Sequence, residues 1–422
     1  MLIINPKRIN EKIEVKPYWY NYYAGYSHTF TQNVIESAGL SQDSVIMDPW
    51  NGAGTTTLMS SVNGFRSIGV DLNPVMRVIA NAKQTTKDDI NLVKARLKGL
   101  SSKADIGPKD SDSLRAWFSE ESIESIRKIE KSILGGKDYW STNEKVHNLT
   151  AAECLMYTAL FNCVRAYLSD FIPSNPTWIK KPKNPDDKIR VPWVQLRDQY
   201  VSYVNGMING MSVVEHDWPS GLSEITVGSS GNLSVDSSSI DFVLTSPPYC
   251  TRIDYGVATL PELSILCVNG EDEVDKIRRK LMGTTTVPKS IENKANSLTG
   301  KCHDFLEAVR SHSSKASKTY YYKNLVQYFY DLMVSLGEID RVLKVKAKFV
   351  CVVQDSYYKD VHCDLPGIVV EMASSRGLML LENVEFESKR NMANMNVGAK
   401  QYRDKRTAYE NVLIFEKRMM NE

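Results

Sequence analysis

Short apolar runs alternate with stretches of helical periodicity along this chain, and most of the apolar runs end at a glycine or a polar residue. Strands that run into a turn and then a helix build a doubly wound α/β sheet. We therefore predict an α/β fold with one doubly wound sheet of seven strands. The predicted strands are Ser44–Met47, Arg66–Val70, Glu224–Val227, Ile240–Thr245, Ala347–Gln354, Leu378–Asn383 and Asn411–Phe415.

Two segments interrupt this pattern. Between Asn81 and about Gly221 the residues follow charged and aromatic helical periodicity with few strand signals, which predicts a helical insertion. Its proline-rich stretch Phe171–Trp193 is not expected to form regular structure. The second interruption, Asn269–Ser317, is polar and lacks strong periodicity, so we expect it to be mobile or ordered by a partner.

The composition fits a folded protein. Of 422 residues, 42% are hydrophobic and 24% charged, and the length allows one large domain with an insertion or two domains. No secretory signal or membrane span is expected, because no stretch approaches about 20 apolar residues. The seven cysteines never form CxxC and the six histidines never form HExxH. We therefore expect buried thiols, no metal and a cytoplasmic location.

The net charge of +2 conceals two basic clusters. Residues Lys276–Lys323 hold eleven Lys and Arg against three acids, and they end in three consecutive tyrosines. Residues Lys389–Arg406 hold six basic residues against one acid. Basic segments with aromatic neighbours can neutralise phosphates and stack bases, although a solvated loop has the same charge pattern.

The first predicted strand ends in a motif that fits a cofactor site. It runs into Asp48, then into a turn containing Gly52 and Gly54, and then into a helix that begins near Thr55. Glycines allow the backbone to approach a ligand, and a helix N-terminus offers free N–H groups to an anion. The second strand ends at Asp71, where an acid can accept hydrogen bonds from both ribose hydroxyls. A nicotinamide site is not favoured, because this turn lacks the third glycine of GxGxxG.

The strand Ile240–Thr245 ends in the rigid turn Ser246-Pro247-Pro248-Tyr249. Two prolines remove two backbone donors, so nearby carbonyls remain available as acceptors. An exocyclic amine on a base becomes nucleophilic only when its hydrogens are held by such acceptors. Ser246 and the Pro247 carbonyl are the candidate acceptors, and Tyr249 would stack on a base that has left its duplex.

These two motifs together resemble the amino-methylating DNA methyltransferases. The segment Asp48–Thr56 is similar to their Asp-Pro-Phe-x-Gly-x-Gly-Thr-Thr motif, with Trp50 in place of Phe. Ser-Pro-Pro-Tyr looks like the tetrapeptide of the cytosine-N4 enzymes, whereas adenine-N6 enzymes usually begin it with Asp or Asn. The resemblance implies a Rossmann-like methyltransferase sheet, S-adenosyl-L-methionine as cofactor, double-stranded DNA as partner and cytosine N4 as the methylated atom.

The resemblance also implies which residues form the site. The catalytic residues would be Ser246, Pro247, Pro248 and Tyr249. The cofactor would contact Asp48, Pro49, Trp50, Gly52, Gly54, Thr55, Thr56, Asp71, Leu72, Phe30 and Ser229, where Ser229 replaces an acid found in many relatives. Candidate DNA contacts are Arg252, Tyr255, Lys180, Lys181, Arg278 and Arg279.

The resemblance divides the chain into core and insertions, in the ranges 1–85 (core, cofactor motif), 86–221 (helical insertion), 222–268 (core, catalytic motif), 269–323 (basic insertion) and 324–422 (core). Both insertions are candidates for reading DNA. A restriction endonuclease or another defence-system protein is the expected partner. Three alternatives stay open: an adenine-N6 enzyme, an RNA methyltransferase and a DNA-binding module with a vestigial pocket.

Overall fold

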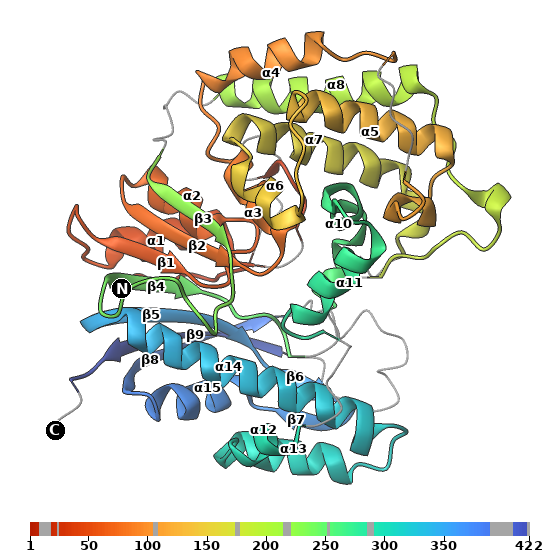
Figure 1. The fold of residues 1–422 in the computed structure, drawn as a ribbon. Helices are drawn as coiled ribbons and strands as arrows, with labels where there is room; N and C mark the ends of the chain where they lie inside the picture. Colours follow the sequence, from red (N-terminus) through yellow and green to blue (C-terminus); the bar gives the residue numbers. More distant parts are fainter. Residues whose placement is uncertain are drawn as a thin grey trace.

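A computed structural model describes residues 1–7, 18–22, 25–103, 109–173, 178–213, 221–250, 254–284, 291–388 and 408–419. Its main sheet has seven strands in the order β3-β2-β1-β4-β5-β9-β8 (Figure 1). Strand β9 runs antiparallel to both of its neighbours, and the pairs from β3 to β5 are parallel. The strands are β1 (Val45–Asp48), β2 (Arg66–Asp71), β3 (Ser223–Val227), β4 (Ile240–Thr245), β5 (Leu343–Gln354), β8 (Leu378–Ser388) and β9 (Ala408–Lys417).

All seven predicted strands are present, so the predicted doubly wound α/β fold with a helical insertion is confirmed. The sequence pattern missed a separate hairpin that follows β5, formed by β6 (Ser356–Tyr358) and β7 (Val361–Cys363).

The helices are α1 (His28–Ser37), α2 (Thr55–Val62), α3 (Pro74–Ala82), α4 (Asp89–Lys98), α5 (Glu120–Leu134), α6 (Thr142–Asn148), α7 (Ala151–Tyr167), α8 (Trp193–Val213), α9 (Tyr255–Ala258), α10 (Leu260–Leu266), α11 (Glu271–Lys280), α12 (Glu292–Asn296), α13 (Gly300–Ser311), α14 (Tyr322–Val342) and α15 (Leu365–Ser374).

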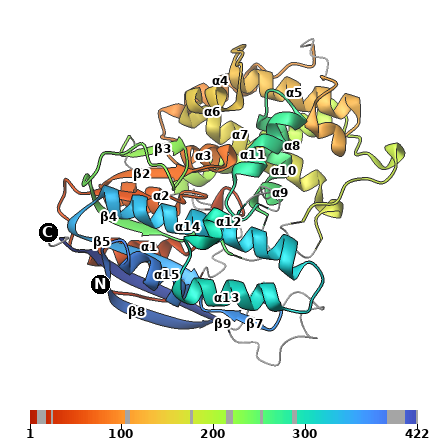
Figure 2. The same ribbon diagram turned by 60° about the horizontal axis from the view of Figure 1, so that its bottom comes forward.

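Helices cover both faces of the sheet because successive strand residues point to opposite sides. Ile46 of β1 and Phe242 of β4 pack with α1 and α2, whereas Met47 and Val243, the next residues of these strands, pack in the cluster that holds α14 and α15. Figures 1 and 2 show α14 and α15 lying along the sheet. The strands β1 and β4, which carry both motifs, are therefore buried in the middle of the sheet.

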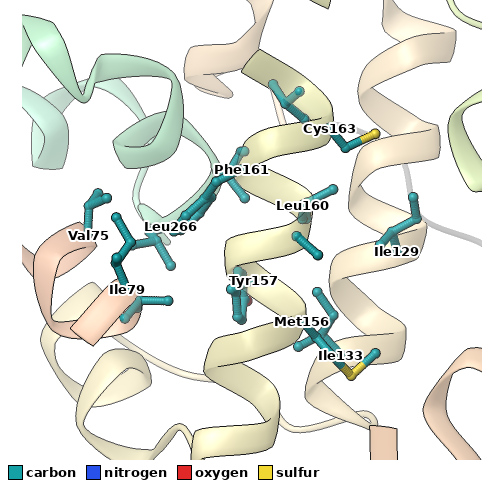
Figure 3. Packing of buried hydrophobic residues seen from close by; sticks show 14 of the residues in the cluster. Val75, Ile79, Ile129, Ile133, Met156, Tyr157, Leu160, Phe161, Cys163 and Leu266 are labelled. Atoms are coloured by element: carbon teal, nitrogen blue, oxygen red, sulfur yellow. The ribbon is translucent and has the colours of Figure 1, made fainter. Parts of the chain in front are cut away.

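The helical insertion is built around α7. Its residues Met156 and Leu160 face Ile129 and Ile133 of α5, while Phe161 lies on the side of α3 and α10 (Figure 3). A helix that is apolar on nearly all sides belongs in a core rather than on a surface. Short 3₁₀ turns, Ser113–Ala116, Ser169–Phe171 and Pro185–Asp187, complete the insertion, and the proline-rich loop is largely irregular as predicted.

A capping box starts α7. The Thr150 hydroxyl accepts a hydrogen bond from the Glu153 backbone N–H at 3.2 Å, and the Thr150 N–H donates to the Glu153 carboxylate at 3.0 Å. We expect Thr150→Ala to lower the free energy of unfolding by about 1 kcal/mol, because helix N–H groups lose an acceptor. Thr150→Ser should match wild type. Urea denaturation checks both variants, and an unchanged midpoint for Thr150→Ala would contradict this account.

The polar interruption contains helices, so its expected mobility or dependence on a partner is wrong for the described part. Helix α13 buries Cys302, Phe305, Leu306 and Val309 against α14 and α15. These positions follow the i, i+3, i+4, i+7 spacing of one helix face. The surrounding Lys, Ser and Thr residues hide this narrow apolar stripe when the segment is judged by its composition.

Buried charges connect α10 to the insertion. Arg165 of α7 donates to both carboxylate oxygens of Glu262 at 2.6 and 2.7 Å. Arg127 of α5 donates to the Ser264 and Ile265 carbonyls at 2.9 and 2.7 Å. Bidentate arginine pairs fix orientation as well as position. The insertion therefore holds the helix that follows the predicted catalytic motif.

The structure also bears on the cysteines, on membrane-spanning helices and on metal-binding clusters. All seven cysteines are free thiols with buried side chains, as predicted. Within the described ranges, no helix has the length and apolar character needed to cross a membrane. The same residues contain no cluster of three or more His, Cys, Asp or Glu side chains that could hold a metal ion.

Candidate cofactor and catalytic site

One cleft of about 960 Å³, including its mouth open to solvent, lies where β1, β2, β3 and β4 end. Ligands of open α/β sheets bind at this edge, beyond the carboxyl ends of the strands. Asp48 and Ser246 both line the cleft, although 198 positions separate them in the chain. The two sequence motifs therefore face the same space.

The two glycines of the turn, Gly52 and Gly54, have different surroundings. Gly52 lines the cleft with a positive φ of 48°, and its N–H donates to the Asp71 carboxylate at 2.9 Å. Gly54 caps α2 with φ 78°, and a Cβ there would lie 2.6 Å from the Ala80 Cβ. Gly54 is therefore required for packing against α3, whereas Gly52 leaves space for a ligand.

Asp48 ties the cofactor turn to the catalytic strand. Its buried carboxylate accepts hydrogen bonds from the Trp50 N–H at 3.1 Å and from the hydroxyls of Thr56 at 2.7 Å, Tyr26 at 3.2 Å and Thr245. Burial raises the pKa of this carboxyl, and these four donors oppose the shift. Because Thr245 ends β4, Asp48 fixes the position of the residues that follow that strand.

Asp71 presents a partly exposed carboxylate to the cleft. One oxygen accepts from the Gly52 N–H and the other from the Asn73 N–H at 2.8 Å. Burial raises the pKa of Asp71 to about 6, and the two backbone donors oppose this rise. A carboxylate oxygen can accept a second hydrogen bond, so the pair can still bind two neighbouring hydroxyls.

An aromatic wall adjoins the glycine turn. Trp50 lines the cleft together with the apolar side chains of Leu72 and Met76. The indole Nε1 of Trp50 is buried and has no hydrogen-bond partner among the described residues. Buried donors are normally paired, so this unpaired N–H on a residue of the cleft wall is an exception.

The backbone of the proline turn is held from two sides. The Tyr328 hydroxyl, from α14, donates to the Pro248 carbonyl at 2.7 Å, and the Tyr249 N–H donates to the Tyr255 hydroxyl at 3.0 Å. Burial raises the pKa of the Tyr249 phenol, which therefore stays neutral. Ser246 directly follows β4, is half-buried and lines the cleft.

Most predicted site residues meet in this cleft. Those that line it are Asp48, Pro49, Trp50, Gly52, Thr55, Asp71, Leu72, Ser246, Pro247, Pro248, Tyr249 and Tyr255. Gly54, Thr56, Phe30 and Ser229 are not part of its lining.

The residues outside the lining have structural reasons for their places. Phe30 is fully buried, with its ring 5.5 Å from the ring of Tyr26. Tyr26 itself lines the cleft, so Phe30 contacts a lining residue, and its contact with a cofactor stays a prediction. Thr56 lies behind Asp48, and the Ser229 hydroxyl accepts a hydrogen bond from Gly231 within its own turn.

Sequence reasoning missed several lining residues. The cleft also contains Tyr22, Gly25, Tyr26, Asn51, Ala53, Asn73, Met76, Gly228, Ser230, Leu281 and Met282. Tyr22 and Tyr26 belong to an aromatic run that the sequence does signal. Leu281 and Met282 follow α11 in the polar interruption, and only the way that helix folds back brings them to the cleft.

Of the candidate DNA contacts that the structure describes, Tyr255 alone lines the cleft. Lys180 and Lys181 are exposed on the loop before α8, where Trp117 donates to the Lys180 carbonyl at 2.8 Å. Arg278 forms ion pairs with Asp254 and Asp275, and Arg279 is exposed. Arg252 and the basic cluster 389–406 lie outside the described residues.

Comparison with known proteins finds one curated relative at moderate coverage. The type II methyltransferase M.BsoBI of Geobacillus stearothermophilus is 22% identical over 300 residues, which cover 64% of this chain and 56% of that protein. The chain thus spans little more than half of its relative's length. No family model matches the chain.

Solved structures align over most of the chain but with low similarity. A SAM-dependent methyltransferase from Methanosarcina mazei covers 92% of this chain and 98% of its own, with 10% identity and a TM-score of 0.31. A geranyl diphosphate C-methyltransferase from Streptomyces coelicolor covers 92% and 78%, with 8% identity and a TM-score of 0.33. These alignments are too weak to bear on function.

Proposed function

We propose that this chain is an S-adenosyl-L-methionine-dependent DNA methyltransferase that methylates the exocyclic N4 amine of cytosine in double-stranded DNA. The observation that carries the proposal is the single cleft shared by the glycine turn, Asp71 and the tetrapeptide beginning at Ser246. The similarity to a protein named as a type II methyltransferase supports the same reaction class. The serine at the start of the tetrapeptide favours cytosine over adenine, as the family resemblance implies.

The cleft fits this cofactor. Asp71 offers two acceptor oxygens to a ribose diol, Gly52 has no side chain to block the approach, and the apolar side chains beside Trp50 suit an adenine ring. When bound, the cofactor supplies a methyl group on a positively charged sulfur.

The residues of the proline turn would prepare the amine. The Ser246 hydroxyl oxygen and the Pro247 carbonyl accept its N–H groups, which increases the electron density on the nitrogen. Tyr249 holds the face of the base, which must leave the duplex to enter the cleft. Because Tyr328 and Tyr255 fix the backbone of this turn, the acceptors are oriented before substrate binds.

The proposal is tested by the product. The protein is incubated with labelled cofactor and duplex DNA, and the nucleosides are separated by mass spectrometry. N4-methylcytosine is expected. N6-methyladenine alone would contradict the base assignment, and transfer to RNA but not to duplex DNA would contradict the substrate.

Cofactor binding should depend on pH through Asp71. The carboxylate must be ionised to accept two hydroxyl groups, and its pKa is about 6. Protonation turns one acceptor oxygen into a donor, so we expect affinity to be about tenfold weaker at pH 5 than at pH 7. Titration calorimetry across this range checks it. In Asp71→Asn the dependence should vanish, and a flat wild-type profile would contradict the role of Asp71.

The DNA contacts remain part of this proposal. Lys180 and Lys181 would meet phosphates from the helical insertion, and Tyr255, Arg278 and Arg279 would contact DNA from the segment after the tetrapeptide. Arg252 would contribute from the same segment. A restriction endonuclease or another defence-system protein is the proposed partner of the enzyme.

A further inference from the structure

An exposed corner between α13 and α14 combines aromatic rings with positive charge. We call it the lysine–tyrosine corner and define it by Lys315, Lys318, Tyr320 and Tyr321. The tyrosines are 41% and 39% exposed, and both lysines are exposed. Exposed apolar area is unfavourable in water, and neighbouring exposed apolar side chains often mark an interaction site. This corner therefore has the composition of a binding surface.

The backbone of the corner is ordered and strained. Ala316 has a left-handed φ of 64°, and a π-helical turn follows over Ser317–Tyr321. The Ser317 hydroxyl donates to the His312 carbonyl, and the Tyr321 ring lies 5.1 Å from the ring of Tyr358 on the hairpin. Left-handed non-glycine residues and π-turns are uncommon in proteins overall. Where they occur, they are often at functional sites. The corner holds its rings in one arrangement rather than leaving them on a free loop.

The corner lies at the edge of the sheet that carries the cleft. Helix α14 runs back along β5, so its first residues lie near the carboxyl ends of the strands (Figures 1 and 2). Tyr328 of α14 touches the Pro248 carbonyl, and Tyr322 begins the helix six positions earlier. At 1.5 Å per residue this places the corner about 9 Å further along the helix axis. It is thus within reach of DNA that inserts a base into the cleft.

The charge of the corner is uncompensated. Neither Lys315 nor Lys318 forms an ion pair with an acid in the described parts of the chain. Lysines of this kind neutralise phosphates, and exposed aromatic rings stack on bases that have lost their neighbours. An extruded base leaves such unstacked bases on either side of the gap.

We propose that the lysine–tyrosine corner holds the DNA beside the extruded base. Lys315 and Lys318 would contact backbone phosphates, and the Tyr320 ring would stack on an unstacked base. This inference rests on the proposed function, because it requires DNA at the cleft. An acidic protein partner would also be attracted by the lysines, but it would not make binding depend on an unpaired base in DNA.

The test compares binding to two short duplexes, one fully paired and one with a single unpaired base. Tyr320→Ala should weaken binding to the second duplex about tenfold, and binding to the paired duplex less, because one base-ring contact is lost. Tyr320→Phe keeps the ring and should bind as wild type does. The double variant Lys315→Ala/Lys318→Ala should reduce the slope of log affinity against log salt by about two.

Matched controls separate the outcomes. Lys94 and Lys98 are exposed on α4, far from the corner in Figure 1, and their double alanine variant should leave the salt slope unchanged. Affinity for S-adenosylmethionine should be unchanged in every variant. Wild-type affinity in Tyr320→Ala, or equal slopes in the two lysine pairs, would overturn the inference and leave the proposed function standing. A wild-type protein that binds no duplex would overturn the proposed function itself.

Discussion

Replacing Asp71 with alanine is expected to weaken the binding of S-adenosylmethionine about 1000-fold. The carboxylate would accept two hydroxyl groups, and hydrogen bonds to a charged group contribute about 1.5–3 kcal/mol each. In the wild-type protein the Gly52 N–H donates to Asp71. The substitution removes this acceptor, so the glycine turn loses a support. Isothermal titration calorimetry measures the change directly.

Controls for this variant come from the same part of the chain. Asp43 is an exposed acid shortly before β1, and Asp43→Ala should bind the cofactor as wild type does. Asp71→Asn keeps the shape but turns an NH₂ group toward one of two backbone donors, so it should also bind weakly. Affinity within threefold of wild type in Asp71→Ala would remove Asp71 from the cofactor site.

Replacing Ser246 with alanine should reduce turnover about 100-fold while cofactor affinity stays the same. The hydroxyl is proposed to accept an amine hydrogen as the nitrogen becomes nucleophilic, and loss of one oriented polar group at a reacting centre commonly costs this much. Ser246 is separate from Asp71 and the glycine turn, which would bind the cofactor. Single-turnover methylation and calorimetry, performed on the same preparation, distinguish the two effects.

A second serine, which flanks β4 at its other end, provides the comparison. Ser239 precedes β4 at its opposite end, and its hydroxyl donates to the Asp236 carbonyl at 2.6 Å. Ser239→Ala should therefore methylate DNA at the wild-type rate. If Ser246→Ala also kept the wild-type rate, the tetrapeptide would have to act through its backbone alone.

The strands and the cofactor turn could be predicted because their signals are local. Ile240–Thr245 is apolar, β-branched or aromatic at nearly every position and stops at two prolines, and the structure gives it the predicted bounds. Asp48 and Asp71 are the last residues of β1 and β2, so their side chains had to lie at the edge where ligands bind.

The remaining lining residues depend on which elements meet, and the sequence does not encode that locally. Tyr26 rather than Phe30 faces the cleft because α1 packs Phe30 into the core. Leu281 and Met282 reach the cleft only because α11 folds back over it. The stripe on α13 follows helical spacing, yet its four apolar residues are diluted by polar ones, so composition outweighed periodicity in the prediction.

The pairing of Arg165 with Glu262 has a consequence for how this fold could exchange its helical insertion. Glu262 is fully buried, and an unpaired charge at such a position is strongly destabilising. An exchange of the helical segment between two proteins would therefore leave a buried carboxylate without its partner, unless the incoming helix brought its own arginine. Recombination of this part of the molecule is permitted only in matched pairs, so the region that would recognise DNA and the region that would modify it must evolve together.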